Sequence, residues 1–393
     1  MSSRPHLVLT LLLGALTAFA PMSIDMYLPS FPTLQREFAG NPGLVQATLS
    51  LFFIGLAIGQ AIYGPLADRF GRKPPLYAGL ALYVVGSVIA AFAPSLETLV
   101  AARFIQGIGG CAGMVIARAI VRDLFDERDS ARMLTMLMLV MGLAPILAPI
   151  VGGQLLVFFG WRSVFWVLTA FGALCLLFSV TSLRESLPPA QRLPGGIGAA
   201  LANYRQLLRD RRYMTQVMTG AFTMAGMFAY ISGSPFVFIE LNGVPAERFG
   251  FLFGLNALGL IAASQINHRL LARHSGRSIL AAATLGFAIA TLLVAANVMT
   301  GIGGFIGLLV PLFFSVASLG FIAPNTTAAA MALHGRIAGA ASALLGILQF
   351  GVGALSVGLV GLFADGSARP MGLVIAACGI GASLLQRLSR RAA

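Results

Sequence analysis

The stretch Gly64-Pro65-Leu66-Ala67-Asp68-Arg69-Phe70-Gly71-Arg72-Lys73 is a short charged turn between two long apolar segments. Residues 44–63 before it and 76–92 after it carry no charge at all. Clustered charges are too costly for the hydrocarbon core of a bilayer, and glycine next to proline is typical of a turn. The pattern therefore predicts two helices that meet in a hairpin at a membrane surface, in an integral membrane protein.

Composition extends this prediction to the whole chain. Of the 393 residues, 58% are hydrophobic and only 10% are charged, and the mean hydropathy is +0.88. A helix needs about 20 apolar residues to cross the hydrocarbon core. Twelve segments meet this need: 7–34, 44–67, 75–93, 98–120, 133–157, 161–182, 214–238, 249–270, 278–299, 303–326, 338–361 and 370–387. We therefore predict an all-α integral membrane protein with twelve transmembrane helices.

The basic residues report the orientation of these helices. The net charge is +13, but the basic residues stand singly or in short groups between apolar runs, so they form no face for nucleic acid. Of the 26 Arg and Lys residues, 21 fall on one side of the predicted membrane, four on the other, and Arg103 within a span. Cytoplasmic loops carry such an excess. We expect a multi-pass membrane protein with both termini and the longest connection in the cytoplasm.

The longest connection, residues 183–213, divides the spans into two sets of six. It predicts an N-terminal half (1–182), a cytoplasmic central loop (183–213) and a C-terminal half (214–393), with a short amphipathic helix over residues 197–208. A Leu-Ala-x-x-x-Gly-Arg frame at residues 66–72 recurs at residues 271–277. The repeat favours two pseudo-symmetric halves with a binding site between them, although a chance match over so short a frame is the alternative.

Asp25 is the clearest charged residue inside a span, because the run from Leu7 to Leu34 is otherwise uncharged. A charge at the bilayer centre costs on the order of 3 kcal/mol or more. Such a site favours the protonated carboxyl, and a carboxyl that exchanges its proton there can serve as a proton carrier. The alternative is that Asp25 lies at the outer headgroup level and is simply solvated.

Arg103 is the second charge inside a span. A guanidinium group does not lose its proton, so Arg103 cannot carry one. It can pair with Asp25 or with a backbone carbonyl and so influence when the aspartate releases its proton. The alternative is a side chain that extends to the outer surface.

Two further spans carry features that suit movement or binding. Gly142, Pro145, Pro149, Gly152 and Gly153 interrupt the fifth span, which predicts either a bend that opens and closes one side of a cavity or a static kink.

Span seven is rich in Phe, Tyr and Met, and adaptable surfaces of this kind suit ligands of varied shape. Phe228 and Tyr230 are its candidate pocket residues, and packing against other helices or lipid is the alternative reading.

Enzymatic chemistry lacks support in the sequence. His6, His268, His274 and His334 lie near the predicted cytoplasmic surface without metal spacing, and the three cysteines lie far apart within apolar spans. The sequence has neither a Walker-type phosphate loop nor a catalytic triad at membrane depth. We therefore expect no enzyme and no cofactor, with the proton gradient as the energy source. The expected partners at this point are protons and the lipid bilayer, and the expected state is a monomer.

These residues give the chain a family resemblance. It resembles the drug/proton antiporters of the major facilitator superfamily, and within them the Bcr/CflA group of bicyclomycin and chloramphenicol resistance exporters. Residues 64–73 resemble the superfamily's loop 2–3 motif, residues 103–107 its fourth-helix proton-coupling motif, and residues 25–29 the first-helix motif of the group. Residues 117–123 are also typical of the group. In the fifth-helix antiporter motif, Ala148 stands where glycine is usual.

The resemblance implies roles for single residues. Asp25 and Arg103 would couple protons. The candidate pocket residues are Tyr27, Gln106, Phe228 and Tyr230. The candidate gating residues are Gly64, Asp68, Arg69, Gly71, Arg72, Arg118, Pro149, Gly152 and Gly153. Asp68 would cap a neighbouring helix N-terminus or pair with a nearby arginine in one conformation only.

The resemblance implies an exporter with a small drug-like molecule as its partner. It would move small, largely apolar compounds across the bacterial inner membrane in exchange for protons, by alternating access. Spans seven to twelve contain no further buried charge that would grip a polar solute, which favours apolar cargo. A carrier for a natural metabolite or nutrient on the same scaffold is the alternative. A receptor or membrane enzyme would need a sizeable soluble domain or a catalytic set, and the sequence has neither.

Overall fold

The structure is a computed structural model that describes residues 3–38, 42–192, 196–332, 334 and 337–391. These residues form helices and short connections, without a β-strand among them. The first half contains α1 (Ser3–Asp25), η1 (Leu28–Ser30), α2 (Phe31–Glu37), α3 (Pro42–Phe70), α4 (Lys73–Ala91), α5 (Leu96–Leu124), α6 (Glu127–Phe159) and α7 (Arg162–Ser182). The rest contains η2 (Pro189–Gln191), α8 (Gly196–Arg209), α9 (Arg211–Pro235), η3 (Phe236–Leu241), α10 (Ala246–Leu270), α11 (Gly276–Thr300), α12 (Gly304–Met331), α13 (Ala338–Leu362) and α14 (Arg369–Arg391).

Twelve helical segments in the described part of the chain are long and apolar enough to cross a membrane. The predicted all-helical fold with twelve spans is confirmed. Several boundaries differ from the prediction. The fifth long helix begins at Glu127, six residues early, because Asp126 accepts a hydrogen bond from the backbone N–H of Asp129 (2.9 Å) and caps it. Span seven begins at Arg211, behind the cap Asp210, and continues through η3 to Leu241.

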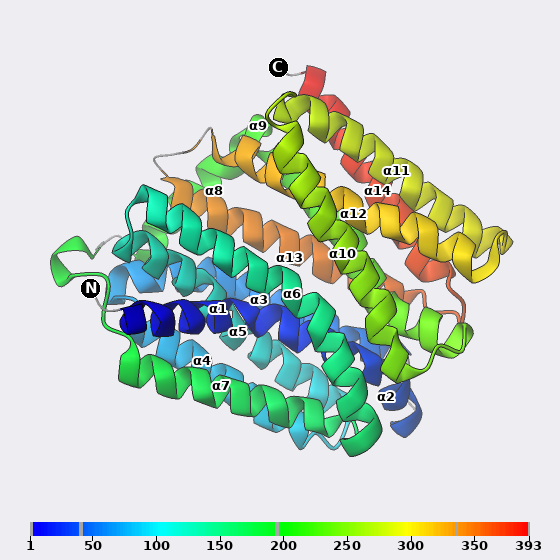
Figure 1. Ribbon diagram of the computed structural model, residues 1–393, viewed down its shortest axis with the longest axis horizontal. Helices are drawn as coiled ribbons and strands as arrows, with labels where there is room; N and C mark the ends of the chain where they lie inside the picture. Colours follow the sequence, from blue (N-terminus) through cyan, green and yellow to red (C-terminus); the bar gives the residue numbers. More distant parts are fainter. Residues whose placement is uncertain (1–2, 39–41, 193–195, 333, 335–336, 392–393) are drawn as a thin grey trace.

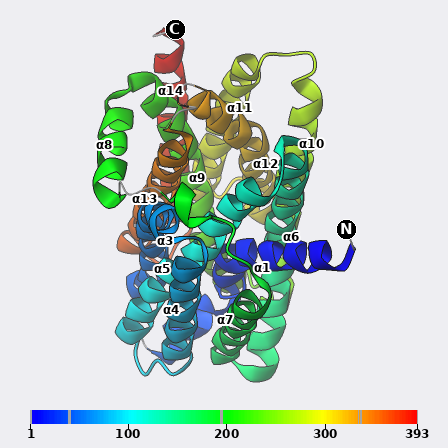
Figure 2. The same cartoon turned by 90° about the vertical axis from the view of Figure 1, so that its left-hand side faces the viewer.

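The helices form two bundles (Figure 1). In the first, α5 packs along α3 and α4, and α7 packs along α4. In the second, α9 packs along α13 and α14, α12 packs along α10 and α11, and α11 packs along α14. The bundles meet mainly where α3 faces α13 and α6 faces α10, as the view in Figure 2 also shows. The predicted helix over residues 197–208 is confirmed as α8, which contacts α3 and α13 and so touches both bundles.

The two ends of the molecule are distinguished by the segments that lie there. The loop end is the one that holds the turn at residues 70–73, the start of α1 and α8, and Figure 2 views the molecule from this side. The opposite end holds α2 and the turn between η3 and α10 (Figure 1).

The first span is interrupted directly after Asp25, the predicted proton carrier. Pro29 has no N–H to give to the carbonyl of Asp25, and its ring would clash with that carbonyl in a regular helix. Helix α1 accordingly ends at Asp25, and the chain continues as the short 3₁₀ helix η1 and then α2. The break places Asp25 at a helix end inside the bundle instead of on the side of a continuous helix.

Candidate functional site

A cavity of about 480 Å³ lies between the two bundles at the loop end. Residues of α3, α5 and α6 form one wall, residues of α12 and α13 form the other, and Asn203 and Tyr204 of α8 complete the lining. Four of the predicted gating residues line it: Gly64, Asp68, Arg72 and Arg118. Its volume is typical of a site for a small molecule.

The opposite end is closed by direct contact between backbones. A Cβ atom added to Gly152 would overlap the carbonyl oxygen of Met26 and lie 2.8 Å from the Met26 Cα. A Cβ on Gly153 would lie 2.8 Å from the carbonyl oxygen of Ala246, and one on Gly250 would lie 2.6 Å from the nitrogen of Ile150. Helix α6, with Pro149 one turn away, therefore packs against the break after α1 and against α10 without intervening side chains.

Hydrogen bonds between the bundles strengthen this closure. Gln46 Nε2 on α3 donates to the Ser232 carbonyl on α9 (2.9 Å), and Ser50 Oγ donates to the Ala354 carbonyl on α13 (2.8 Å). The structure is therefore open at the loop end and closed at the opposite end.

Arg103 lies fully buried on α5. One terminal nitrogen donates to the carbonyl of Ser23 (2.9 Å), and the other pairs with the Gln106 side chain. Its guanidinium carbon lies 4.1 Å from the ring centroid of Phe52 and 4.9 Å from that of Tyr27. A desolvated cation gains most from such aromatic faces. The alternative of a side chain extended to the outer surface is wrong, because these contacts hold the group in the bundle.

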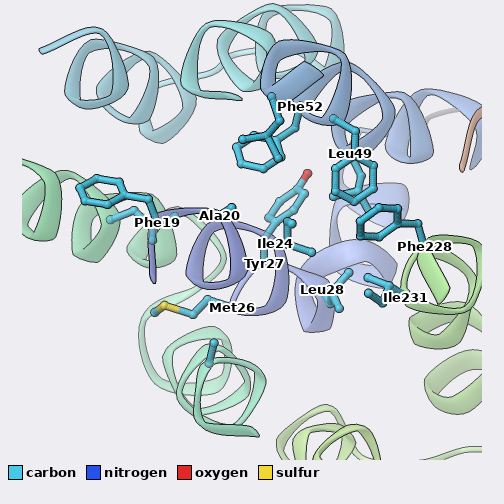
Figure 3. Packing of buried hydrophobic residues seen from close by; sticks show 14 of the residues in the cluster. Phe19, Ala20, Ile24, Met26, Tyr27, Leu28, Leu49, Phe52, Phe228 and Ile231 are labelled. Carbon is cyan, nitrogen blue, oxygen red and sulfur yellow. The ribbon is translucent and has the colours of Figure 1, made fainter. Parts of the chain in front are cut away.

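Of the two partners predicted for Arg103, the structure shows the backbone carbonyl and not Asp25. The described residues include no ion pair between Arg103 and Asp25, because the guanidinium is directed to the Ser23 carbonyl two residues earlier. Gln106 donates to Ser87 Oγ (2.7 Å), and Tyr27 Oη donates to Thr48 Oγ1 (3.2 Å). Tyr27 and Gln106 thus belong to the group of side chains that surrounds Arg103, and they do not line the loop-end cavity. Figure 3 shows Tyr27 next to Phe52.

Asp25 is 3% exposed, and its carboxylate has no hydrogen-bond or ion-pair partner among the described residues. The reading of Asp25 as a solvated residue at the headgroup level is therefore wrong. Tyr230 of the other bundle is close enough for an electrostatic interaction with the carboxylate. Tyr230 Oη accepts a hydrogen bond from Asn256 Nδ2 (2.7 Å), which leaves the phenolic hydrogen free to be donated.

Asn256 was not identified by sequence reasoning. The only signal was one amide within the otherwise apolar residues 249–263 of α10, and nothing in the sequence relates it to Tyr230 on α9 or to Asp25 on α1. The fold joins Asn256 to Tyr230 by a hydrogen bond and places Tyr230 within electrostatic range of Asp25.

Phe228 lies in an aromatic cluster where the bundles meet. Its ring centroid is 4.2 Å from that of Phe53 on α3 and 6.0 Å from that of Phe350 on α13. Figure 3 shows Phe228 beside Ile231 and near Leu49. Phe228 and Tyr230 are buried and do not line the loop-end cavity, so in this conformation they seal the space between the bundles.

The turn at residues 70–73 is tied to three carboxylates. Arg72 Nη1 bonds to Asp68 (2.5 Å), and its Nε and Nη2 bond to the two oxygens of Asp123 (2.8 and 3.1 Å). Glu185 accepts from the backbone N–H of Arg72 (2.8 Å) and of Lys73 (3.1 Å). Such bidentate, charge-assisted bonds are strong. Sequence reasoning found Asp68 and Arg72 but missed Asp123 and Glu185.

Gly71 is required by geometry. Its φ angle is +92°, in the region that favours glycine, and a Cβ there would lie 2.7 Å from Oε2 of Glu185. Arg69 does not join this network; its guanidinium lies 5.1 Å from the ring of Phe70.

The bonds to Glu185 predict a pH dependence of stability. Burial raises the pKa of the Glu185 carboxyl, but the N–H groups of Arg72, Leu187 and Lys73 outweigh burial, so the pKa lies below its ordinary value of 4.5. The stabilisation is therefore present above that value and is lost as the pH falls through the lowered pKa. Between about pH 6 and about pH 3, the melting temperature of the wild type should fall more than that of Glu185→Gln. Equal falls would show that these bonds do not stabilise the fold.

No cluster of three or more His, Cys, Asp or Glu residues that could hold a metal ion occurs within the described ranges. The site therefore consists of a cavity, a buried carboxyl, a caged arginine and a charged turn.

Comparison with known proteins agrees with this geometry. The profile described as Major Facilitator Superfamily matches residues 13–358. The chain belongs to the Major Facilitator Superfamily. It is 38% identical over 376 residues to the "Uncharacterized MFS-type transporter YdgK" of Bacillus subtilis, covering 95% of this chain and 93% of the relative. It is 31% identical over 373 residues to the "Bicyclomycin resistance protein homolog" of Haemophilus influenzae, covering 94% and 93%.

Solved structures of the Major Facilitator Superfamily share the fold. A bacterial homologue of the lysosomal transporter Spinster, solved in an inward-facing conformation, superposes with a TM-score of 0.77 at 16% identity, over 100% of this chain and 98% of that chain. The xylose transporter XylE from Escherichia coli, partially occluded and inward open, gives 0.74 at 16% identity, over 97% of each chain. The chain is thus a multi-pass membrane protein of a transporter family, and its resemblance to the Bcr/CflA group is confirmed.

Proposed function

We propose that this protein is a proton-coupled exporter of the bacterial inner membrane that carries small, largely apolar compounds out of the cytoplasm. Relatives named for bicyclomycin resistance and for multidrug resistance support this cargo class. The observation that carries the proposal is the carboxyl of Asp25 at the contact between the bundles, which among the described residues is buried and without a hydrogen-bond or ion-pair partner.

The loop end faces the cytoplasm in this proposal. The excess of basic residues at this end supports the assignment, because cytoplasmic loops carry such an excess. Both termini then lie in the cytoplasm, and the cavity is open to it. The closed contact between α6 and the break after α1 faces outside.

The transport cycle follows from the two ends. In the open-inward form, the cavity accepts a compound and Asp25 gives up its proton to the cytoplasm. The halves, residues 1–182 and 214–393, then rock about their contact, so that the loop end closes and the outer contact opens. Asp25 takes a proton from outside as the compound leaves, and the return step resets the site.

Asp68 suits the role of a latch for the closed loop end. In the structure it pairs with Arg72, and it faces across the cavity to Ala338 and Gly339, the first residues of α13. A carboxylate is stabilised at a helix N-terminus by about 0.3–1 kcal/mol. Closing the cavity would bring Asp68 to that terminus, so the same carboxylate has one partner in each conformation.

The test is compound-driven proton movement in inside-out membrane vesicles that hold the wild-type protein. After respiration has acidified the vesicle interior, a transported compound should release part of the pH gradient, and vesicles without the protein should show no release. A panel of antibiotics and dyes should include at least one such compound. If the whole panel fails, the carrier for a natural metabolite takes the place of the drug exporter.

Arg103→Gln should reduce this proton-coupled export about tenfold, because hydrogen bonds to a charged group are worth about 1.5–3 kcal/mol. Arg103 holds the carbonyl of Ser23, two residues from Asp25, and its loss frees the end of α1. Arg103→Lys keeps the charge but lacks the fork that reaches both Ser23 and Gln106. Export should therefore fall in both variants. Wild-type rates in Arg103→Gln would contradict the positioning role.

A further inference from the structure

The loop-end cavity contains two arginines without a carboxylate partner. Arg118 and Arg122 lie one turn apart on the same face of α5, and both line the cavity. Neither forms an ion pair among the described residues. Arg118 uses its Nε to bond the carbonyl of Met114 (3.1 Å), which leaves its two terminal nitrogens for the cavity.

The carboxylates near this pair are already occupied. Asp68 is the one carboxylate among the residues that line the cavity, and it bonds to Arg72 at 2.5 Å. Asp123, the chain neighbour of Arg122, bonds to Arg72 through both of its oxygens and also accepts from Ser186, so it attracts Arg122 electrostatically without forming an ion pair with it. The lining therefore keeps an excess of positive charge after every bond that the structure contains is counted.

Arg118 and Arg122 repel each other when no anion lies between them. The guanidinium groups of Arg118 and Arg122 are close enough to interact repulsively, and like charges four residues apart destabilise a helix by about 0.2–0.5 kcal/mol. An anion between them would convert the repulsion into two charge-assisted contacts. Topology alone requires basic residues in the loops and does not require two of them to face a cavity between the bundles.

The rest of the lining suits an apolar body. Val115, Leu134 and Met331 contribute hydrophobic surface, and Tyr204 of α8 adds an aromatic ring. A ligand that fills the cavity would thus place an acidic group at the arginines and a hydrocarbon or aromatic portion against these side chains.

We propose that the cavity is a binding site for amphipathic organic anions, in which Arg122 captures the acidic group and Arg118, one turn deeper, holds it. That the bound anion is exported cargo rests on the proposed export function. The same chemistry could come from a free amphipathic acid or from the headgroup of an anionic lipid. Either source requires both arginines.

The experiment measures fluorescence anisotropy with the purified full-length protein in nanodiscs of phosphatidylcholine. The probes are fluorescein and rhodamine 123, which share an aromatic skeleton but are an anion and a cation. The wild type should bind fluorescein at least about tenfold more tightly than rhodamine 123, and Arg118→Gln and Arg122→Gln should each weaken fluorescein binding about tenfold. Arg205→Gln, an exposed position on α8 outside this lining, is the matched control and should bind as the wild type does.

Further measurements test the role of positive charge and distinguish a free acid from a lipid headgroup as the natural ligand. Arg118→Lys should retain part of the preference for fluorescein, and added salt should weaken fluorescein binding to the wild type. Nanodiscs with phosphatidylglycerol should lower fluorescein binding if a lipid headgroup is the natural occupant and leave it unchanged if a free acid is. Equal binding of the two probes, or an undiminished preference in both glutamine variants, would overturn the anion site. The vesicle assay is independent: it can succeed with a neutral compound when this site fails, and fail when fluorescein binds.

Discussion

Vesicles with Asp25→Asn should show no compound-driven proton movement above the level of vesicles without the protein. The amide has nearly the shape of the carboxyl but cannot exchange a proton. Because the Asp25 carboxylate has no hydrogen-bond partner among the described residues, the substitution removes no bond that holds the fold. The expected change is therefore complete loss of coupling with normal expression and normal binding of a transported compound.

Asp365→Asn is the matched control for Asp25→Asn. Asp365 is exposed in the connection before α14 and bonds only to Ser367. It should support the same proton movement as the wild type. Proton movement that persists in Asp25→Asn would mean that another group carries the proton, and the role proposed for Asp25 would then be wrong.

Gly152→Ala is expected to cause the second largest loss. The added methyl group would overlap the Met26 carbonyl, and backbone atoms cannot turn aside as a side chain could. Overpacking of this kind costs about 1–3 kcal/mol, which corresponds to a shift of about 5- to 150-fold in the balance between conformations. The closed state of the opposite end should therefore become rare, and export should fall by a similar factor.

Gly286→Ala tests whether the added methyl group or its position matters. Gly286 is exposed on α11, and a Cβ there meets nothing within 4 Å, so transport should be unchanged. Maleimide labelling of Val45→Cys reports the state of the opposite end, because residue 45 is 3% exposed in the closed form and its side chain forms no hydrogen bond between the bundles. Faster labelling is expected when Gly152→Ala is added. Unchanged labelling and export would show that this contact does not control the closure.

The helices could be predicted from the sequence because each is an apolar run of membrane length between charged turns. The break in the first span is less visible. The sequence predicted one span over residues 7–34, and only the fold shows that it is interrupted before Pro29, that α1 ends at Asp25 and that α6 packs against the backbone there. Asp25 and Arg103 were recognised because a charge in an apolar run is conspicuous in one dimension.

The partners of these residues could not be predicted, since they come from distant elements. Asn256 meets Tyr230 from the next helix, and Asp123 and Glu185 reach Arg72 from 51 and 113 residues away. An isolated polar residue in a span gives no direction for its side chain. The pocket residues were uncertain for another reason: an aromatic such as Phe228 can line a cavity in one conformation and seal the bundles in another.

The burial of Asp25 as the one such carboxylate among the described residues also limits the concentration ratio that the exporter can maintain across the membrane. Among the described residues, Asp25 is the only carboxylate that is buried, so the proposed cycle exchanges one proton at this site for each molecule exported. A proton that enters across a membrane potential of about 100 mV supplies about 2.3 kcal/mol. Since each tenfold concentration ratio requires about 1.4 kcal/mol, that potential alone sustains a gradient of a neutral compound of only about 50-fold. Against a toxic compound that diffuses back, such a pump lowers the internal concentration by a bounded factor, and the rest of the protection depends on how slowly the membrane leaks.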